Sequence, residues 1–150
     1  MPTIDPNVQF QNTAEDILRE GWDFYPNLAS GLGLHEYDGR LPDISPAALA
    51  RRVREVEDGV ASLRRIDGNS LDRQNGFDRR LLTLALKKER FELVELRTHE
   101  NNPVEMLDHI ELSNYVKRDY APLRERVRSL TRALEGVPAF LKTLQDGLSD

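Results

Sequence analysis

The stretch SPAALARRVREVEDGVASL, residues 45–63, decides the fold class. Ser45 followed by Pro46 is a strong helix start, because a serine hydroxyl caps free backbone amides and proline fits the first helical turn. Apolar residues then recur at steps of four and three, at Leu49, Val53, Val56, Val60 and Leu63. On a helix this spacing confines them to about 80° of arc. The stretch therefore predicts an amphipathic helix that packs through a narrow apolar seam.

Proline and glycine mark further helix boundaries on both sides of this stretch. We expect helices over residues 7–24, 26–32, 45–66, 70–97, 103–116 and 122–137, with a last segment separated by Gly136 and Pro138. The alternating β-branched runs that indicate strands are nearly missing. Because the connections are mostly short, consecutive helices should pack antiparallel. The sequence predicts an all-α fold, an antiparallel helical bundle or array of about five to six helices with one extended polar loop at 33–44.

Two of these helices carry additional expectations. Ser70 is placed to cap the helix over 70–97, and the apolar residues of that helix cover more than half of its circumference. We therefore expect it to be the central helix, packed on several sides. The helix from Pro122 repeats the seam of the first one, with apolar residues at Leu123, Val127, Leu130, Leu134 and Val137.

The composition and charge of the chain exclude several classes of protein. A chain of 150 residues, 39% hydrophobic and 31% charged, fits a single helical domain over 1–150. The absence of cysteine excludes disulfides, Cys-ligated zinc and thiol catalysis. Residues 1–10 show no signal peptide and no apolar run is long enough for a membrane span, so we expect a cytoplasmic protein with no membrane partner. The net charge of −5 argues against a nucleic-acid partner.

The polar loop GLHEYDGRLPDI, residues 33–44, is the one place outside a helix where several reactive side chains converge. Its candidate residues are His35, Tyr37, Asp38 and Arg40. In one interpretation, hydrogen bonds and an ion pair of His35, Asp38 and Arg40 hold the loop together. In the other, the loop contacts a ligand or a neighbouring domain. The zinc signature of two histidines four residues apart does not fit, because Gly39 stands where the second histidine would be.

The remaining reactive side chains favour structural roles. His99 and His109 lie at or near helix ends, and the line Arg124, Arg128 and Arg132 is typical of a solvated helix face. Ser30 before a glycine is no nucleophile elbow, since no strand precedes it. We therefore expect no catalytic, cofactor-binding or metal residues in this chain.

The run PNLASGLGLHEYDGRLPDIS, residues 26–45, resembles the opening of a bacterial family known as domain of unknown function 885. Its pattern is a proline, a small pair, and then Gly-x-His-x-Tyr-Asp-x-Arg-Leu-Pro-Asp-x-Ser. Weaker matches are Phe91-Glu92-Leu93, Asn102-Pro103 and the run from Val137 to Leu141. The resemblance covers about residues 22–148.

This resemblance implies that the chain is the N-terminal helical part of a longer, all-helical protein. Family members look like relatives of thermolysin-type zinc peptidases, whose His-Glu metal motif lies in a C-terminal half that no position here matches. The resemblance implies a non-catalytic helical subdomain, with zinc only in the longer relative. Its partner would be the remainder of the polypeptide, or a second copy, bound through exposed apolar helix faces. The alternative is a free-standing helical protein–protein interaction module.

Overall fold

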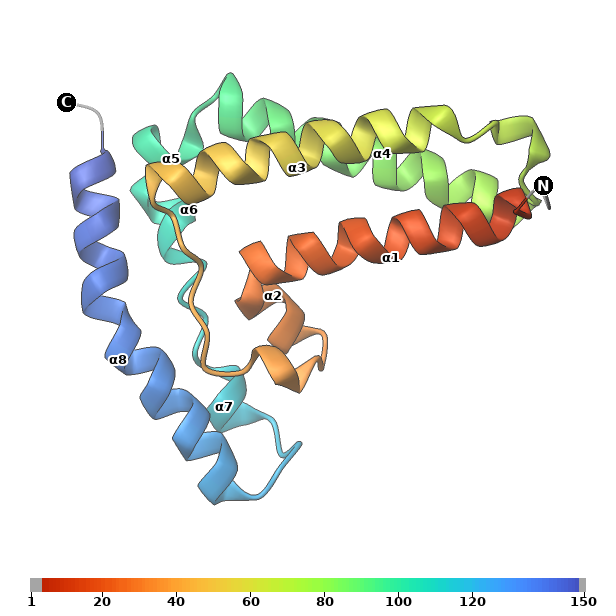
Figure 1. Ribbon diagram of the computed structural model, residues 1–150. Coiled ribbons are helices and arrows are strands. Elements are labelled where there is room, and N and C mark those ends of the chain that lie inside the picture. The colour runs from red at the N-terminus through yellow and green to blue at the C-terminus, as the bar shows by residue number, and fades with distance from the viewer. Residues whose placement is uncertain (1–3, 149–150) are drawn as a thin grey trace. The chain divides into compact units, whose positions relative to one another are not determined.

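The computed structural model describes residues 4–148, which contain eight α-helices, two short 3-10 helices and no β-strand. The elements are α1 (Pro6–Phe24), α2 (Pro26–Gly31), η1 (His35–Tyr37), α3 (Pro46–Arg65), η2 (Gly68–Ser70), α4 (Arg73–Val94), α5 (Thr98–Asn101), α6 (Pro103–Leu107), α7 (Asn114–Lys117) and α8 (Leu123–Gly147) (Figure 1). The all-α prediction is confirmed, with four long helices and four short ones. Within residues 4–148, no helix has both the length and the hydrophobicity needed to cross a bilayer.

The described chain divides into two compact units. Residues 4–20 and 50–96 form unit 1, and residues 21–49 and 97–148 form unit 2. Two of the three boundaries fall inside α1 and α3, and the third falls in the connection between α4 and α5. That residues 1–150 are a single domain stays a prediction.

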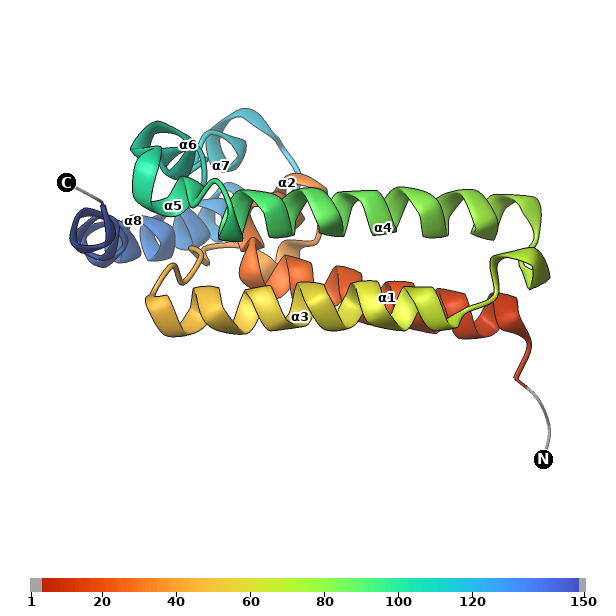
Figure 2. The ribbon, with the colours of Figure 1, turned by 90° about the horizontal axis from the view of Figure 1, so that it is seen from above.

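Unit 1 is built from α1, α3 and α4, and consecutive helices of the unit run antiparallel (Figure 2). Its core consists of Phe10, Ile17, Val56, Val60, Leu63, Ile66 and Leu86. Val56 and Leu63 are completely buried, so the predicted seam of residues 49–63 forms the centre of the unit. The predicted cap is also present, since the Ser45 hydroxyl accepts a hydrogen bond from the Ala48 amide at 3.3 Å.

The cap of α4 lies two residues later than predicted, at Asp72, and the helix begins at Arg73. Ser70 instead donates to Asp67, and Asp72 caps α4 by accepting a hydrogen bond from the Asn75 amide at 2.8 Å. The Asn7 side chain accepts from the Asp72 amide and from Nδ2 of Asn75, both at 3.0 Å. These contacts tie the start of α1 to the start of α4, a long-range constraint that outweighs the local capping preference of serine.

The prediction that the 70–97 helix is central is wrong. Only Asn75, Leu86 and Leu93 of α4 are buried, whereas Phe77, Leu81, Leu84 and Phe91 are between 50% and 64% exposed. The helix buries one face against α1 and α3 and presents a second apolar face outward. An apolar composition all around a helix does not reveal which face is covered.

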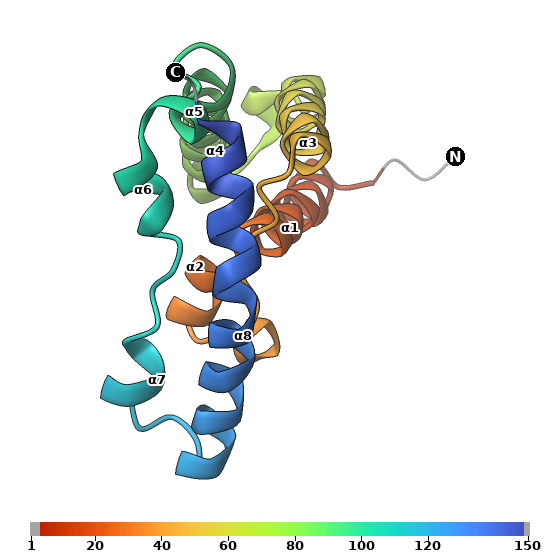
Figure 3. The same ribbon diagram turned by 90° about the vertical axis from the view of Figure 1, so that its left-hand side faces the viewer.

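Unit 2 contains α2, η1, the loop of residues 33–44 and α5 to α8, and both α5 and α7 contact α8 (Figure 3). Its core consists of Ile44, Met106, Phe140 and Leu144, with Leu41 and Ile110 packed against it. The loop is thus partly apolar, and it supplies Leu41 and Ile44 to the core.

Two helix boundaries in unit 2 differ from the prediction. The helix expected over 103–116 is split into α6 and α7. Local turns between them provide partners for backbone amides without a helix; the Ser113 amide, for example, donates to the Glu111 carboxylate at 2.6 Å. Conversely, α8 continues through Pro138. A proline inside a helix costs one backbone hydrogen bond, but here the helix beyond it buries Phe140 and Leu144.

The apolar seam predicted for the 122–137 helix is mostly uncovered. Leu123, Val127 and Leu134 are between 49% and 67% exposed, and α8 buries Ala133, Phe140 and Leu144 instead. The buried residues lie on a different side of α8 from the predicted seam. Like α4, α8 therefore has one packed face and one exposed apolar face.

Candidate functional site

The carboxylate of Asp38 lies at the centre of the polar loop and is only 8% exposed. Its Oδ1 accepts a hydrogen bond from the Ser30 hydroxyl at 2.5 Å, and its Oδ2 accepts one from the Tyr120 phenol at 2.6 Å. Nδ1 of His35 lies 3.2 Å from the same Oδ2. We call Ser30, His35, Asp38 and Tyr120 the Asp38 cluster. A buried carboxylate needs several donors, and this cluster supplies two hydroxyl groups and places an imidazole nitrogen beside them.

Short elements bring the cluster together. Ser30 lies in α2, His35 begins η1, Asp38 ends η1, and Tyr120 lies in the connection between α7 and α8. The rings of His35 and Tyr120 stack with centroids 3.8 Å apart and an interplanar angle of 5°. Burial, followed by the hydrogen bond to Asp38, raises the pKa of the Tyr120 phenol well above its usual value. The phenol therefore stays protonated and remains a donor.

A second set of contacts holds the loop against α7 and α8. The Gly39 amide donates to the Tyr115 hydroxyl at 2.7 Å, and Arg118 donates to the Gly31 carbonyl at 2.6 Å. Gly39 has φ +78°, and a Cβ there would lie 2.9 Å from the Ser129 carbonyl oxygen of α8. Both the backbone conformation and the close approach require glycine at this position.

The remaining candidates of the loop, Tyr37 and Arg40, form a neighbouring contact. Tyr37 is buried, and the Arg40 guanidinium lies 4.9 Å from the centroid of its ring. Arg40 also pairs with Asp23 at 3.1 Å. Within the loop, His35 contacts Asp38, whereas the ion partner of Arg40, Asp23, lies outside the loop in α1. Contact of this loop with a ligand or another domain stays a prediction.

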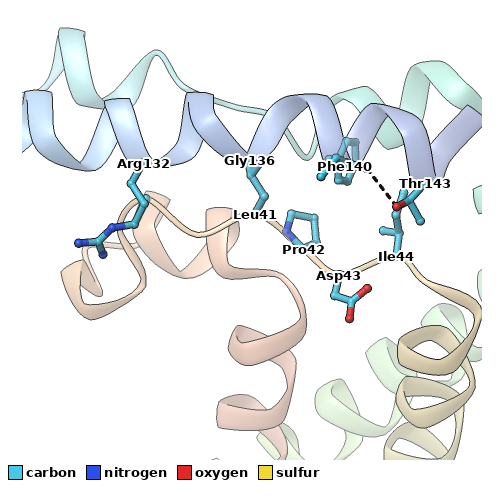
Figure 4. A pocket seen from close by; sticks show the side chains of 10 residues that line it. Leu41, Pro42, Asp43, Ile44, Arg132, Gly136, Phe140 and Thr143 are labelled. Atoms are coloured by element: carbon cyan, nitrogen blue, oxygen red, sulfur yellow. Dashed lines mark hydrogen bonds between the residues drawn. The ribbon is translucent and has the colours of Figure 1, made fainter.

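A shallow groove of about 300 Å³ lies beside the cluster, between the loop and α8 (Figure 4). It is lined by Gly39, Leu41, Pro42, Asp43, Ile44, Arg132, Gly136, Ala139, Phe140 and Thr143. Arg132 lies at one end and Asp43 farther along the loop, beside Pro42, and their side chains point away from the apolar centre rather than toward a common point (Figure 4). The groove offers an apolar surface without convergent polar groups.

The geometry of the Asp38 cluster favours binding over nucleophilic chemistry. Ser30 and His35 both bond to Asp38 and not to each other, so the base–nucleophile pair of a hydrolytic triad is not formed.

The Asp38 cluster holds the imidazole of His35 in a fixed orientation. Asp38 holds Nδ1 of His35, the side chain is 43% exposed, and Nε2 makes no hydrogen bond or ion pair within residues 4–148. Across the same residues, no group of three or more His, Asp or Glu is arranged to hold a metal ion.

The family assignment comes from the sequence of the region that contains this cluster. The sequence model of the family described as "Bacterial protein of unknown function (DUF885)" matches residues 26–150, most of the chain. The chain belongs to this family. The match begins at the first residue of α2 and includes every member of the Asp38 cluster. No curated protein is significantly similar to this DUF885 chain.

A solved structure of similar fold is described as "a putative lipoprotein of unknown function" from Shewanella oneidensis. It superposes with a TM-score of 0.82 at 20% sequence identity, over 93% of this chain and 26% of that chain. The DUF885 chain thus spans about a quarter of the length of that relative. At this identity the likeness shows the fold.

The same comparison contradicts the predicted cytoplasmic location, because a lipoprotein is a membrane-anchored, exported protein. The prediction rested on the lack of a signal peptide in residues 1–10. Because this chain matches only about a quarter of its relative, its first ten residues say nothing about the cellular compartment. We therefore withdraw the prediction.

Sequence reasoning identified the loop but not its partners. Ser30 was considered only as a nucleophile, and Tyr115 and Tyr120 were not singled out. The two tyrosines follow Asp38 by more than 70 residues, and no local pattern links them to it. His109 stacks on Tyr25 at 5.2 Å, and His99 lies 3.3 Å from Glu100, both near helix ends as predicted.

Proposed function

We propose that this chain is a non-catalytic helical framework segment of a longer, metallopeptidase-like DUF885 protein. The observation that carries the proposal is the comparison of lengths: a solved relative shares the fold over 93% of this chain, yet that region is 26% of the relative. The greater part of such a protein lies outside the region compared here.

The contacts of the polar loop support a framework role for this segment. Asp38 and Ser30 bond to each other, and Tyr120 bonds to Asp38, so these groups are engaged inside the segment. Among the four described residues of the Asp38 cluster, His35 alone has an edge that is both oriented and exposed. We propose that His35, with Tyr37, Asp38 and Arg40 behind it, forms a contact of the loop with a ligand or with the remainder of the protein. This contact would help to wall a substrate channel.

The decisive experiment is to read the gene downstream of codon 150. We expect the frame to continue into a helical region with a His-Glu zinc signature. A stop codon directly after Asp150 contradicts the proposal. Zinc analysis and a peptidase assay on the longer product and on the 150-residue chain then locate the activity. We expect both zinc and activity in the longer product alone.

Within the longer protein, His35→Ala tests the role of the loop. We expect lower activity with an unchanged zinc content, because His35 acts as a contact and not as a ligand. Arg124→Ala, an exposed residue of α8, is the matched control and should leave activity unchanged. Equal activity of the wild type and His35→Ala contradicts a contact role.

The exposed faces of α4 and α8 favour a second candidate, a free-standing interaction module. It predicts that the purified chain associates with a partner or with itself through those faces. Sedimentation equilibrium of the chain alone distinguishes the two cases when combined with the gene sequence. A stable monomer encoded by a frame that ends at codon 150 would contradict both.

A further inference from the structure

Helix α4 presents a row of large apolar side chains to solvent. Phe77, Leu81, Leu84 and Phe91 are 58%, 58%, 64% and 50% exposed. Steps of four, three and seven residues place them within about 80° of arc. They lie opposite the buried residues Leu86 and Leu93, so the packing of α4 in unit 1 does not cover them. We call these four residues the α4 stripe.

A basic row borders the stripe on one side. Arg73, Arg80 and Lys87 are exposed and follow each other at steps of seven residues, so they form a line along the helix. Within residues 4–148 none of the three makes an ion pair, although the chain carries a net charge of −5 and acidic residues are abundant. The guanidinium of Arg80 also lies over the ring of Phe77, 5.7 Å from its centroid, at the edge of the stripe. The three cations without an ion pair form a local basic surface on a chain whose net charge is negative.

We infer that the α4 stripe docks an amphipathic helix whose own apolar stripe is bordered by aspartate or glutamate. A seam with steps of four and three residues is the geometry by which helices pack along each other. The basic row occupies the flanking position that pairs with charges of the partner helix in such packing. Carboxylates on the partner therefore fit both the position and the sign of Arg73, Arg80 and Lys87.

A second copy of α4 fits this surface less well. Antiparallel pairing of two stripes places the basic row of one copy against the basic row of the other. Parallel pairing instead brings Lys88, which lies on the stripe between Leu84 and Phe91, against its own copy. Either arrangement sets like charges together. An anionic membrane is also disfavoured, because the three cations of the row are fewer than the roughly four to eight clustered basic residues that bind anionic lipids.

This inference rests on the proposed function in one respect, that the docked helix belongs to the remainder of the longer protein. It adds the face of the segment that makes the contact and the chemistry of the helix that it meets. The gene sequence tests the proposed function, and the titration below tests the docking surface. A failure of one is therefore distinguishable from a failure of the other.

The experiment titrates the full 150-residue chain into two labelled synthetic helices and follows fluorescence anisotropy. Both peptides have about three heptads with leucine at the seam positions; one carries glutamate and the other lysine at the flanking positions. We expect the glutamate peptide to bind at least about tenfold more tightly, a difference of about 1.4 kcal/mol that shrinks with added salt.

Three variants assign the binding to α4. Arg80→Glu with Lys87→Glu should reverse the preference toward the lysine peptide. Leu84→Asp should abolish binding of both peptides, with an unchanged circular dichroism spectrum because Leu84 is exposed. Arg54→Glu with Arg64→Glu, two exposed residues of α3, makes the same change of charge elsewhere in unit 1 and should leave the preference unchanged.

Several outcomes would overturn the inference. They are no binding of either peptide, equal binding of both, or a preference that Arg80→Glu with Lys87→Glu leaves unaltered. Self-association that Leu84→Asp abolishes would assign the stripe to a second copy. Sedimentation of the chain with phosphatidylglycerol vesicles, lost in the same variant, would assign it to a membrane.

Discussion

The phenol of Tyr120 donates a 2.6 Å hydrogen bond to Oδ2 of Asp38, across 82 residues of sequence. The same Oδ2 lies 3.2 Å from Nδ1 of His35, and the Tyr120 ring stacks on the imidazole. Tyr120 therefore fixes the carboxylate and the imidazole together. It joins the loop of residues 33–44 to the segment that precedes α8, and the stability of unit 2 should depend on it.

Tyr120→Phe should destabilise the protein by about 1–3 kcal/mol, because it keeps the stacked ring but removes one of the donors to a buried carboxylate. Urea denaturation followed by circular dichroism measures the loss. Tyr37→Phe is the matched control, since the Tyr37 hydroxyl makes no hydrogen bond within residues 4–148; we expect a change below about 0.5 kcal/mol. Equal effects of the two variants would show that the hydrogen bond to Asp38 contributes nothing specific.

Gly39→Ala and Gly33→Ala should differ in their cost. Both glycines have positive φ, at +78° and +95°, so an alanine at either position is strained by about 1–2 kcal/mol. Only at Gly39 does the added Cβ meet the Ser129 carbonyl, at 2.9 Å, whereas nothing lies within 4 Å at Gly33. We expect Gly39→Ala to cost about 1–3 kcal/mol more than Gly33→Ala in chemical denaturation. A larger loss at Gly33 would contradict the close approach of the loop to α8.

The sequence was informative where local chemistry determines the structure. The Ser45–Pro46 start and the seam through Val56 and Leu63 appear in the structure as predicted, because a cap and a single buried face leave few alternatives. The polar loop was also located correctly, since its glycine and proline residues exclude a long helix. In these regions the local preference and the final packing agree.

Prediction failed where long-range contacts determine the structure. Pro138 ends a helix in isolation, yet α8 continues because Phe140 and Leu144 become buried beyond it. The apolar residues of α4 indicated burial on several sides, but a sequence does not record which apolar face has a partner. In the site, the Asp38 cluster depends on Tyr120, whose distance in sequence hides the contact.

The buried ion pair of unit 1 gives a third prediction. Arg52 is 3% exposed and donates to both carboxylate oxygens of Glu89, at 2.8 and 3.0 Å. Glu89→Gln should destabilise the protein by about 1–3 kcal/mol, because the buried guanidinium loses the charge of Glu89 and keeps Glu55, 3.4 Å away, as a charged partner. The double variant Arg52→Met with Glu89→Leu should recover most of this loss in the same denaturation experiment.

The matched control for this pair is Glu15→Gln, which breaks the exposed Arg19–Glu15 pair at 2.8 Å and should cost less than about 0.5 kcal/mol. A cost for Glu89→Gln as small as the control would mean that water reaches Arg52. A double variant less stable than Glu89→Gln would mean that apolar side chains do not fill the site.

His109 gives the fourth prediction, a dependence of stability on pH. Burial lowers the pKa of His109 from 6.5, and it outweighs the opposite effect of Glu105 and Asp108. The unfolded chain therefore binds a proton at a higher pH than the folded one. Stability from this residue is complete above pH 6.5 and is lost as the pH falls toward the lower pKa of the folded state.

His109→Phe keeps an aromatic ring against Tyr25 and removes the titration, so its urea midpoint should fall less than that of the wild type between about pH 7 and pH 5. Because all carboxylates are common to both proteins, the difference between the two pH profiles isolates His109. Parallel profiles, or an NMR titration of His109 with a midpoint above that of an unfolded histidine, would contradict a buried neutral imidazole.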